Sequence, residues 1–282
     1  MSLPPKWLRR LKGQIVFAYR KQTWKSRANP GFLVLGAQKA GTSSLSGYLG
    51  QHPSLYPSSR KEMHFFSGGT DQRTDKYELG ERWFRAHFPK RSQMSKEAKA
   101  FDNSPTYLFN PLCPERIARQ IPDVKMIVLL RNPTQRAISH YFHEFNRNRE
   151  TLPIQSAMEC EEERLREALA NQDFRHPAVK LHSYKLRGHY REQLQRYFDI
   201  FPRQQLLVLR SESMFEDPGS VVRQVFEFLE VDPELDGIDY TPVNTGDATT
   251  ADVPDSTVRY LDDYFAPLNH SLYELLGEDF RW

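Results

Sequence analysis

Three short apolar runs, separated by longer segments of helical character, constrain the fold of this chain more than any other feature. The runs are 32–35, 125–130 and 205–209. Apart from Lys125 and Gln205 at their starts, the runs are apolar throughout, which is typical of strands covered on both faces, as in a parallel sheet. Helices are expected at 45–51, from 133 to about 148, at 155–170 and at 218–229, and a loop at 236–254. The pattern predicts an α/β fold in which helices flank a central parallel sheet.

Charge is distributed unevenly along the 282 residues. Residues 1–30 hold eight basic side chains and no acidic one, whereas the other 252 residues hold 31 basic and 36 acidic ones. The turn signal Asn29-Pro30-Gly31 lies between the two parts. We expect a basic N-terminal extension at 1–30 and one globular domain at 31–282. Because nucleic-acid-binding domains usually carry positive charge on the folded body, no nucleic-acid partner is expected.

The N-terminal extension has the spacing of an amphipathic helix. Apolar residues recur at about helical intervals with Arg and Lys between them: Trp7, Leu8, Leu11, Ile15 and Tyr19. Such a helix can lie on an anionic membrane surface as a peripheral contact, or it can dock on the domain with its basic face in water. Of the two, we expect the docked arrangement.

The chain carries no other targeting or metal-binding signal that we recognise. No apolar segment approaches the roughly 20 residues of a membrane span, and no signal peptide pattern is present. Cys113 and Cys160 lack metal-ligand spacing, and the nine histidines form no paired-ligand motif. We therefore expect a cytoplasmic protein without a metal.

A glycine-bracketed turn follows the first apolar run. Its residues are Gly36-Ala37-Gln38-Lys39-Ala40-Gly41-Thr42-Ser43-Ser44. Backbone N–H groups converge at such a turn before a helix, so it suits an anion. A Walker loop has its lysine directly after the last glycine, but Lys39 precedes Gly41 by two residues. A lysine at the loop tip can neutralise a phosphosulfate leaving group without a metal. The alternative is a tight turn whose lysine faces water.

A second motif follows the second apolar run and begins Arg131-Asn-Pro133. Arg131 stands at the carboxyl end of the predicted strand, where open α/β sheets bind ligands. Pro133 suits the first turn of a helix, and Ser139 lies about two turns along it. An arginine with a hydroxyl nearby suits a phosphate monoester.

Together the two motifs resemble those of the sulfotransferases that use PAPS (3′-phosphoadenosine-5′-phosphosulfate). GAQKAGTSS is similar to their 5′-phosphosulfate motif and RNPTQRAIS to their 3′-phosphate motif, in the same order and about 90 residues apart. Further matches are to the heparan sulfate 3-O- and N-sulfotransferase branch, in a bacterial-type form: 61–66, 83–84, 88–89, 104–107, 188–190, 216–218 and 280–282. The resemblance covers about 32–282 and implies a single P-loop-type domain.

The resemblance also implies residue roles. The 5′-phosphosulfate of PAPS would be bound by Lys39, Ala40, Gly41, Thr42, Ser43 and Ser44, and the 3′-phosphate by Arg131 and Ser139, with Tyr190 also at the donor. Glu62 would be the general base, Lys39 would stabilise the leaving group, and His64 would assist the base or position the acceptor. The acceptor would present a hydroxyl or an amine on a glycan, a glycolipid or a small metabolite.

The pattern around the predicted base agrees with that role. Glu62 and His64 are two residues apart, so in an extended segment both side chains point to the same side. Phe65 and Phe66 would supply the partial desolvation from which a carboxylate base benefits. The alternative is two surface residues beside a buried Phe-Phe pair.

Three departures from the branch concern the acceptor. Asn103 replaces a usual lysine, Ser67 replaces the aspartate of 3-O-sulfating enzymes, and an acidic segment at 245–254 replaces a cysteine-stapled Lys-Gly-Arg loop. A polyanionic glycan needs a basic cleft, and the body of the chain is net acidic. Heparan sulfate is therefore not the acceptor that we expect.

Two other functions fit parts of the pattern. A P-loop kinase would use the same kind of turn with ATP and magnesium, although the position of Lys39 argues against it. A non-catalytic adaptor would use the fold and the basic extension to bind nucleotides or anionic polymers.

Overall fold

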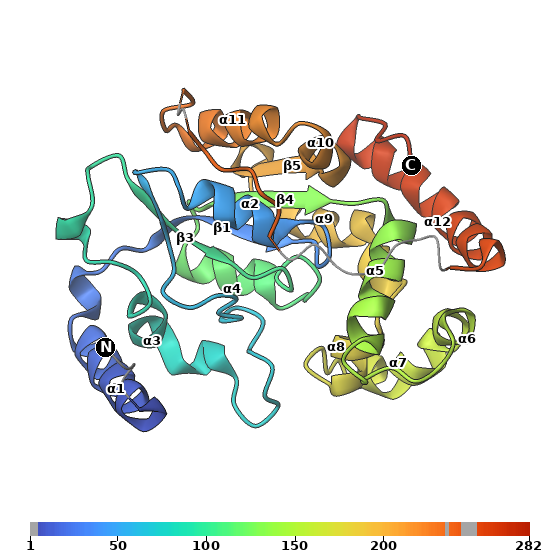
Figure 1. The fold of residues 1–282 in the computed structure, drawn as a ribbon, viewed down its shortest axis with the longest axis horizontal. Coiled ribbons are helices and arrows are strands. Elements are labelled where there is room, and N and C mark those ends of the chain that lie inside the picture. The colour runs from blue at the N-terminus through green and yellow to red at the C-terminus, as the bar shows by residue number, and fades with distance from the viewer. Residues whose placement is uncertain (1–4, 235–236, 244–252) are drawn as a thin grey trace.

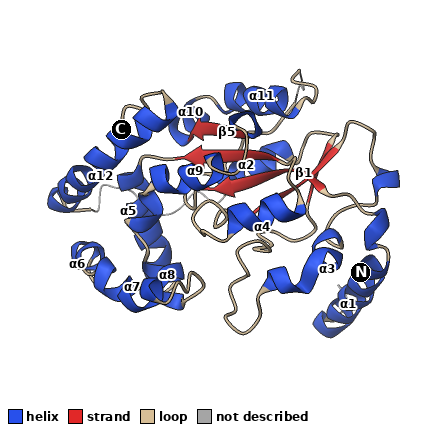
Figure 2. Cartoon of the chain, turned by 180° about the vertical axis from the view of Figure 1, so that it is seen from behind, coloured by secondary structure: helices blue, strands red, loops and turns tan. Residues whose placement is uncertain are grey.

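A computed structural model describes residues 5–234, 237–243 and 253–282. The described strands form one sheet in the order β2-β3-β1-β4-β5, and every neighbouring pair is parallel (Figure 1). The strands are β1 (Pro30–Gly36), β2 (Leu55–Pro57), β3 (Lys99–Asn103), β4 (Lys125–Leu130) and β5 (Leu206–Arg210). Helices cover both faces of the sheet (Figure 2). The predicted α/β fold is therefore confirmed.

The helices agree with the sequence pattern where that pattern was strong. They are α1 (Lys6–Gln22), α2 (Thr42–Leu49), α3 (Gly80–Arg85), α4 (Cys113–Gln120), α5 (Pro133–Phe145), α6 (Ile154–Glu159), α7 (Glu161–Ala170), α8 (Pro177–His182), α9 (Tyr190–Phe198), α10 (Ser211–Glu216), α11 (Pro218–Leu229) and α12 (Asp255–Leu276). The single helix predicted at 155–170 is two helices that meet at Cys160. The loop predicted at 236–254 falls largely outside the described residues.

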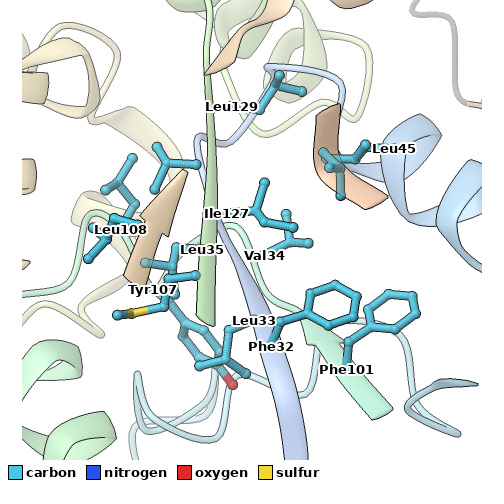
Figure 3. Close-up of a cluster of buried hydrophobic side chains, with 14 of the residues drawn as sticks. Phe32, Leu33, Val34, Leu35, Leu45, Phe101, Tyr107, Leu108, Ile127 and Leu129 are labelled. Carbon is cyan, nitrogen blue, oxygen red and sulfur yellow. The ribbon is translucent and has the colours of Figure 1, made fainter. Parts of the chain in front are cut away.

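The core explains why the apolar runs became strands. The side chains of 32–35 in β1 and of 126–130 in β4 are fully buried, and Phe32 stacks on Phe101 of β3 at 4.7 Å between ring centroids. Figure 3 shows Leu45 of α2 on one side of β1 and Leu108 on the other. Gly36 at the end of β1 pairs with Val128 of β4. Because the two strands are parallel neighbours, the segments that follow them emerge at the same sheet edge.

Helix α1 only partly follows the prediction. It is a helix and it contacts the domain, because Phe17 packs on His87 at 4.7 Å and on Trp83 at 6.4 Å between ring centroids. The side chains predicted to dock are instead exposed, including Trp7 and Ile15. The expectation of an apolar docked face was wrong because Phe17, on another side of the helix, packs on the domain, whereas Tyr19 of the predicted face is half exposed and accepts a hydrogen bond from Lys90 at 2.9 Å. The proposed division between 1–30 and 31–282 stays a prediction.

Within the described residues, no helix combines the length and the apolar character required to cross a bilayer. Cys113 and Cys160 are both free thiols, the first buried and the second partly exposed.

Glu150 ties together the helices beside α5. Its buried carboxylate accepts hydrogen bonds from Arg164 Nη1 at 2.6 Å, from Tyr184 Oη at 2.8 Å, and from the backbone N–H groups of Thr151 and Leu152 at 2.8 and 2.9 Å. Burial alone would raise the pKa of Glu150, but these hydrogen bonds lower it to about 2. The carboxylate is therefore stabilised in the folded state.

Replacement of Glu150 by Gln is expected to destabilise the fold at neutral pH by about 3 kcal/mol. The amide of Gln has a single acceptor oxygen, so it cannot replace both carboxylate oxygens, each of which accepts hydrogen bonds. The pKa is lower in the folded protein than its ordinary value of 4.5, so the stabilisation is complete above that pH and disappears as the pH falls toward 2. Thermal melts from pH 7 to pH 3 would measure a shrinking gap between variant and wild type. Glu163→Gln, an exposed change on α7, is the control and should leave the melt unchanged at every pH.

Candidate functional site

A cavity of about 1340 Å³ opens at the carboxyl ends of the central strands. It is lined by the glycine turn, the segments after β2 and β3, α5, α10 and residues 240–243. Among the predicted site residues, the lining includes Lys39, Gly41, Thr42, Ser43, Ser44, Glu62, His64, Arg131 and Ser139. Two motifs that lie about 90 residues apart in the sequence thus face one cavity, as their positions on neighbouring strands require.

The two motifs also touch each other. Arg131 Nη1 donates a hydrogen bond to the carbonyl oxygen of Lys39 at 3.1 Å. The Arg131 guanidinium lies over the ring of Phe215, 5.8 Å from its centroid. Tyr190 is buried and donates from its hydroxyl to the carbonyl oxygen of Arg131 at 2.9 Å. Tyr190 therefore holds the backbone of Arg131 and does not line the cavity. The family resemblance had implied a place for Tyr190 directly at the donor.

Gly41 shapes the turn. Its φ of 89° lies in the left-handed region, and a Cβ atom added there would be 2.7 Å from Cε of Met214. Thr42 begins α2, and no side chain among the described residues caps the helix start. The N–H groups of the first turn of α2 have no acceptor within the helix, so they are available to an anion.

Neighbouring side chains fix the turn in place. Ser211 Oγ donates a hydrogen bond to the carbonyl oxygen of Ala40 at 2.7 Å. Ala40 does not line the cavity, and its backbone helps to hold the turn in place. Asn103 Nδ2 donates to the carbonyl oxygen of Thr42 at 2.8 Å. The position where the branch has a lysine is thus used here to hold the turn against β3.

Ser44 has a role that the sequence did not reveal. Its hydroxyl accepts from the N–H of Val243 at 2.9 Å and donates to the carbonyl oxygen of the same residue at 3.2 Å. Tyr48 Oη donates to the carbonyl oxygen of Tyr240 at 2.9 Å. These contacts bind residues 240–243 to α2 and close one side of the cavity.

Lys39 lies beside a histidine that the sequence interpretation missed. Lys39 Nζ is 3.4 Å from Nδ1 of His143, one helical turn beyond Ser139 on α5. Burial and the nearby Lys39 lower the pKa of His143 to about 4, so its ring is neutral at pH 7. Burial, with Arg131 close by, also lowers the pKa of Lys39. The spacing of His143 from Ser139 was the sequence signal that could have indicated this position.

Glu62 and His64 meet, but not through the predicted backbone. Glu62 Oε2 is 3.4 Å from His64 Nε2, while the φ angles of the two residues are 49° and 53°. The segment is thus two left-handed residues rather than an extended strand. The extended geometry is lost because the N–H groups of His64 and Phe65 are held by Ser104 Oγ at 3.1 Å and Tyr107 Oη at 2.9 Å.

The electrostatic environment of Glu62 also differs from the expectation. The hydrogen bond from His64 outweighs burial and lowers the pKa of Glu62, so the carboxylate is ionised at neutral pH. Phe65 and Phe66 are fully buried, and Phe65 stacks on Phe84 at 4.5 Å between ring centroids. The pair is part of an aromatic core and does not produce the raised pKa that desolvation alone would give.

Asp102 supports this segment from beneath. Its Oδ2 accepts hydrogen bonds from Ser104 Oγ at 3.0 Å and Tyr107 Oη at 2.7 Å, the same two oxygens that hold the backbone beside His64. Asp102 is fully buried, and burial raises the pKa of its carboxyl group. A buried, hydrogen-bonded network of this kind holds the neighbouring segment rigidly.

The charge of the cavity is opposite to that of the body of the chain. Among the described residues, the Lys and Arg residues of the lining are Lys39, Lys61, Arg131, Arg147, Arg149, Arg175, Lys180 and Arg187, whereas the acidic ones are Glu62 and Glu144. The expectation that the acidic body of the chain disfavours a basic cleft was therefore wrong. Sequence-wide charge does not report where the charges gather.

Arg187 is the most unusual of these cations. Its side chain is 4% exposed, and its Nη1 has no hydrogen-bond partner among the described residues. Burial, together with the nearby Arg136, lowers its pKa to about 9. Its Nε donates to Ser183 Oγ at 2.8 Å, and its guanidinium lies 4.2 Å from the centroid of the Phe109 ring. A buried cation without a carboxylate partner is suited to an anionic ligand.

The described residues contain no group of three or more His, Cys, Asp and Glu side chains placed to hold a metal ion.

Comparison with known proteins gives the family. Residues 29–241 match the family described as Sulfotransferase domain, which is most of the chain. The chain belongs to the sulfotransferase family. The family assignment confirms the enzyme class predicted from the two motifs and rejects the P-loop kinase alternative.

Named sulfotransferases match most of this chain. Heparan sulfate glucosamine 3-O-sulfotransferase 6 of Homo sapiens is 28% identical over 279 residues, which cover 91% of this chain and 74% of that protein. Membrane-associated sulfotransferase kil1 of Dictyostelium discoideum is 25% identical over 323 residues, which cover 90% of this chain and 66% of kil1. The chain spans only 23% of the Caenorhabditis briggsae heparan sulfate N-deacetylase/N-sulfotransferase 1 that it also matches.

Solved sulfotransferase structures share the fold. A sulfotransferase from Alicyclobacillus acidocaldarius has a TM-score of 0.72 and 33% identity, over 90% of this chain and 98% of that one. Mouse sulfotransferase SULT7A1, complexed with PAP (the desulfated form of PAPS), has a TM-score of 0.50 and 14% identity, over 94% of this chain and 89% of that one, and it indicates the fold alone. The P-loop-type architecture is thereby confirmed.

Proposed function

We propose that this sulfotransferase moves the sulfuryl group of PAPS to a hydroxyl or an amine of an acceptor. The observation that carries the proposal is the hydrogen bond from Arg131 to the carbonyl oxygen of Lys39. It joins the predicted 3′-phosphate and 5′-phosphosulfate motifs at the wall of a single cavity. A ligand with phosphate groups at both ends suits that arrangement.

The residues present fit the donor. The uncapped N–H groups at the start of α2 and the close approach allowed by Gly41 suit its 5′-phosphate, and Arg131 with Ser139 suits its 3′-phosphate. Tyr190 acts through Arg131 as a positioning residue. When bound, PAPS supplies an activated sulfuryl group whose leaving group is a phosphate. Lys39 would donate to the oxygen between sulfur and phosphate and so neutralise the charge that develops there.

The acceptor is activated by Glu62 in this proposal. Glu62 accepts the proton of the acceptor hydroxyl or amine as the acceptor atom forms its bond to sulfur and the sulfur–oxygen bond to the phosphate breaks. His64 holds the Glu62 carboxylate by the 3.4 Å contact, and the Asp102 network holds His64. The neutral ring of His143 keeps Lys39 directed into the cavity.

The basic lining favours an acceptor with an acidic group. Arg175, Lys180 and Arg187 face the cavity from the segment after α7, from α8 and from the segment before α9, away from the two donor motifs. The buried Nη1 of Arg187 has no partner among the described side chains, so a carboxylate, sulfate or phosphate on the acceptor would satisfy it. Relatives named for heparan sulfate match this chain, and an acidic glycan, glycolipid or small metabolite suits this lining.

Ligand-dependent melting tests the donor assignment. PAP is expected to raise the melting temperature, whereas ATP with magnesium should have little effect. Arg131→Met should weaken PAP binding by about 10- to 100-fold, because it removes charge-assisted hydrogen bonds to phosphate. Arg223→Gln, an exposed change outside the cavity, is the matched control. A melt raised by heparin but not by PAP would contradict the proposal and favour a non-catalytic adaptor.

A cytoplasmic location stays a prediction. Fractionation of cells that produce the full chain would test it.

A further inference from the structure

The outer surface of α1 is not used by the proposed reaction. None of its residues lines the cavity. Six of its large apolar side chains are between 43% and 65% exposed: Trp7, Leu8, Leu11, Ile15, Val16 and Tyr19. Exposed apolar area concentrated on one helix indicates an interaction surface rather than scattered surface residues.

Five of the six exposed side chains lie on one side of the helix, and Val16 lies outside their arc. At about 100° per residue, Trp7, Leu11, Ile15, Leu8 and Tyr19 fall within an arc of about 120°. Phe17, which packs on His87 and Trp83, lies about 140° from the middle of that arc. The contact with the domain therefore turns the apolar stripe outward, and Figure 1 shows α1 at the edge of the molecule beside α3.

The positive charges of α1 favour an anionic partner. Arg9, Arg10, Lys12, Arg20 and Lys21 belong to the helix, and no acidic residue does. Lys12 borders one edge of the stripe, and Arg10 and Lys21 border the other. Lys90 adds a further cation at 2.9 Å from the hydroxyl of Tyr19. A stripe of Trp, Leu and Ile edged by cations is complementary to the apolar interior and anionic headgroups of a membrane surface.

We propose that α1 is a membrane-surface anchor that inserts its apolar stripe among anionic lipids. The proposal does not depend on the sulfuryl-transfer reaction. It requires only that the stripe partitions into the lipid interface and that the neighbouring Arg and Lys residues are attracted to the headgroups.

Sedimentation of the full chain with lipid vesicles tests the anchor. The protein is expected to pellet with vesicles that contain phosphatidylglycerol as about one third of the lipid, and to stay in the supernatant with pure phosphatidylcholine. The double variant L11S/I15S should bind at least about tenfold more weakly, because it removes two apolar side chains from the stripe. The triple variant R10Q/K12Q/K21Q, which removes the three cations that border the stripe, should bind on the order of 100-fold more weakly, at about a factor of five per charge.

A matched control removes exposed apolar side chains elsewhere. The double variant L112S/I200S changes residues that are 45% and 41% exposed, outside α1 and outside the cavity, and should bind as the wild type does. The shift of melting temperature with PAP reports folding and the donor site separately in every variant. Three results would overturn the anchor. The first is wild-type protein that sediments with neither kind of vesicle, and the second is equal binding to both kinds. The third is a dimer in gel filtration that L11S/I15S converts to a monomer.

Discussion

Lys39→Ala is expected to lower kcat by on the order of 100- to 1,000-fold while the acceptor KM changes little. Lys39 is the one lysine of the glycine turn, and its Nζ is directed along the cavity wall by His143 at 3.4 Å. In the proposed mechanism Lys39 stabilises the negative charge that develops on the leaving phosphate only in the transition state. Contacts of this kind affect turnover rather than substrate binding. Steady-state kinetics at saturating PAPS would measure the change.

The control for Lys39→Ala removes the same amount of positive charge from the cavity at a different position. Lys61→Ala also removes one lysine from the lining, but that side chain is exposed at the rim. It should cost less than about fivefold in kcat, since exposed charges are screened by solvent. Equal losses in the two variants would mean that Lys39 acts only through net charge. The PAP-dependent melt must be retained in both, because alanine at the φ of 71° found for Lys39 carries some backbone strain.

Glu62→Gln is expected to lower kcat by on the order of 100- to 10,000-fold and to leave PAP affinity unchanged. The amide is close in shape to the carboxylate but cannot accept the acceptor proton. The pKa of Glu62 is lowered by its hydrogen bond with His64, so the active, ionised form persists through neutral and mildly acidic pH. In the wild type, the fall of kcat/KM attributable to this group should therefore lie below pH 4.5.

Glu144 is the matched control for Glu62, because it is the other carboxylate of the cavity lining. It lies 2.7 Å from Arg149 Nε, and burial raises its pKa. Glu144→Gln should keep turnover within about tenfold of the wild type, provided that the PAP-dependent melt is retained. An active Glu62→Gln together with an inactive Glu144→Gln would transfer the role of base to Glu144.

The sequence predicted the central strands well because their signals were local. The runs within β1 and β4 are apolar and buried, as strands covered on both faces must be, and β5 at the sheet edge carries an apolar run that is only partly buried. β2 has three residues, and β3 contains Lys99, Asp102 and Asn103, so neither shows a distinct pattern. Asp102 is tolerated in a buried strand only because Ser104 and Tyr107 donate hydrogen bonds to it, and those partners depend on the tertiary fold. The long α12 was missed, with Pro267 inside it weakening the helical signal.

The candidate site was predictable where a motif carried it and hidden where packing made it. Lys39, Arg131 and Ser139 follow from strand–helix junctions, and the structure brings all three to one cavity. The contact of His143 with Lys39 and the unpartnered Nη1 of Arg187 arise from helices that approach only in the fold. The basic character of the cavity was likewise hidden by a body that is acidic in sum.

A crystal structure with PAP bound is the most direct test of the central claim. The glycine turn and the Arg131 motif should bind the two ends of one PAP molecule. Its 5′-phosphate should contact the N–H groups at the start of α2, and its 3′-phosphate should lie within hydrogen-bond distance of Arg131 and Ser139. Lys39 Nζ should then point to the position from which sulfur is transferred. PAP bound with its phosphates exchanged between the two motifs, or outside this cavity, would contradict the account.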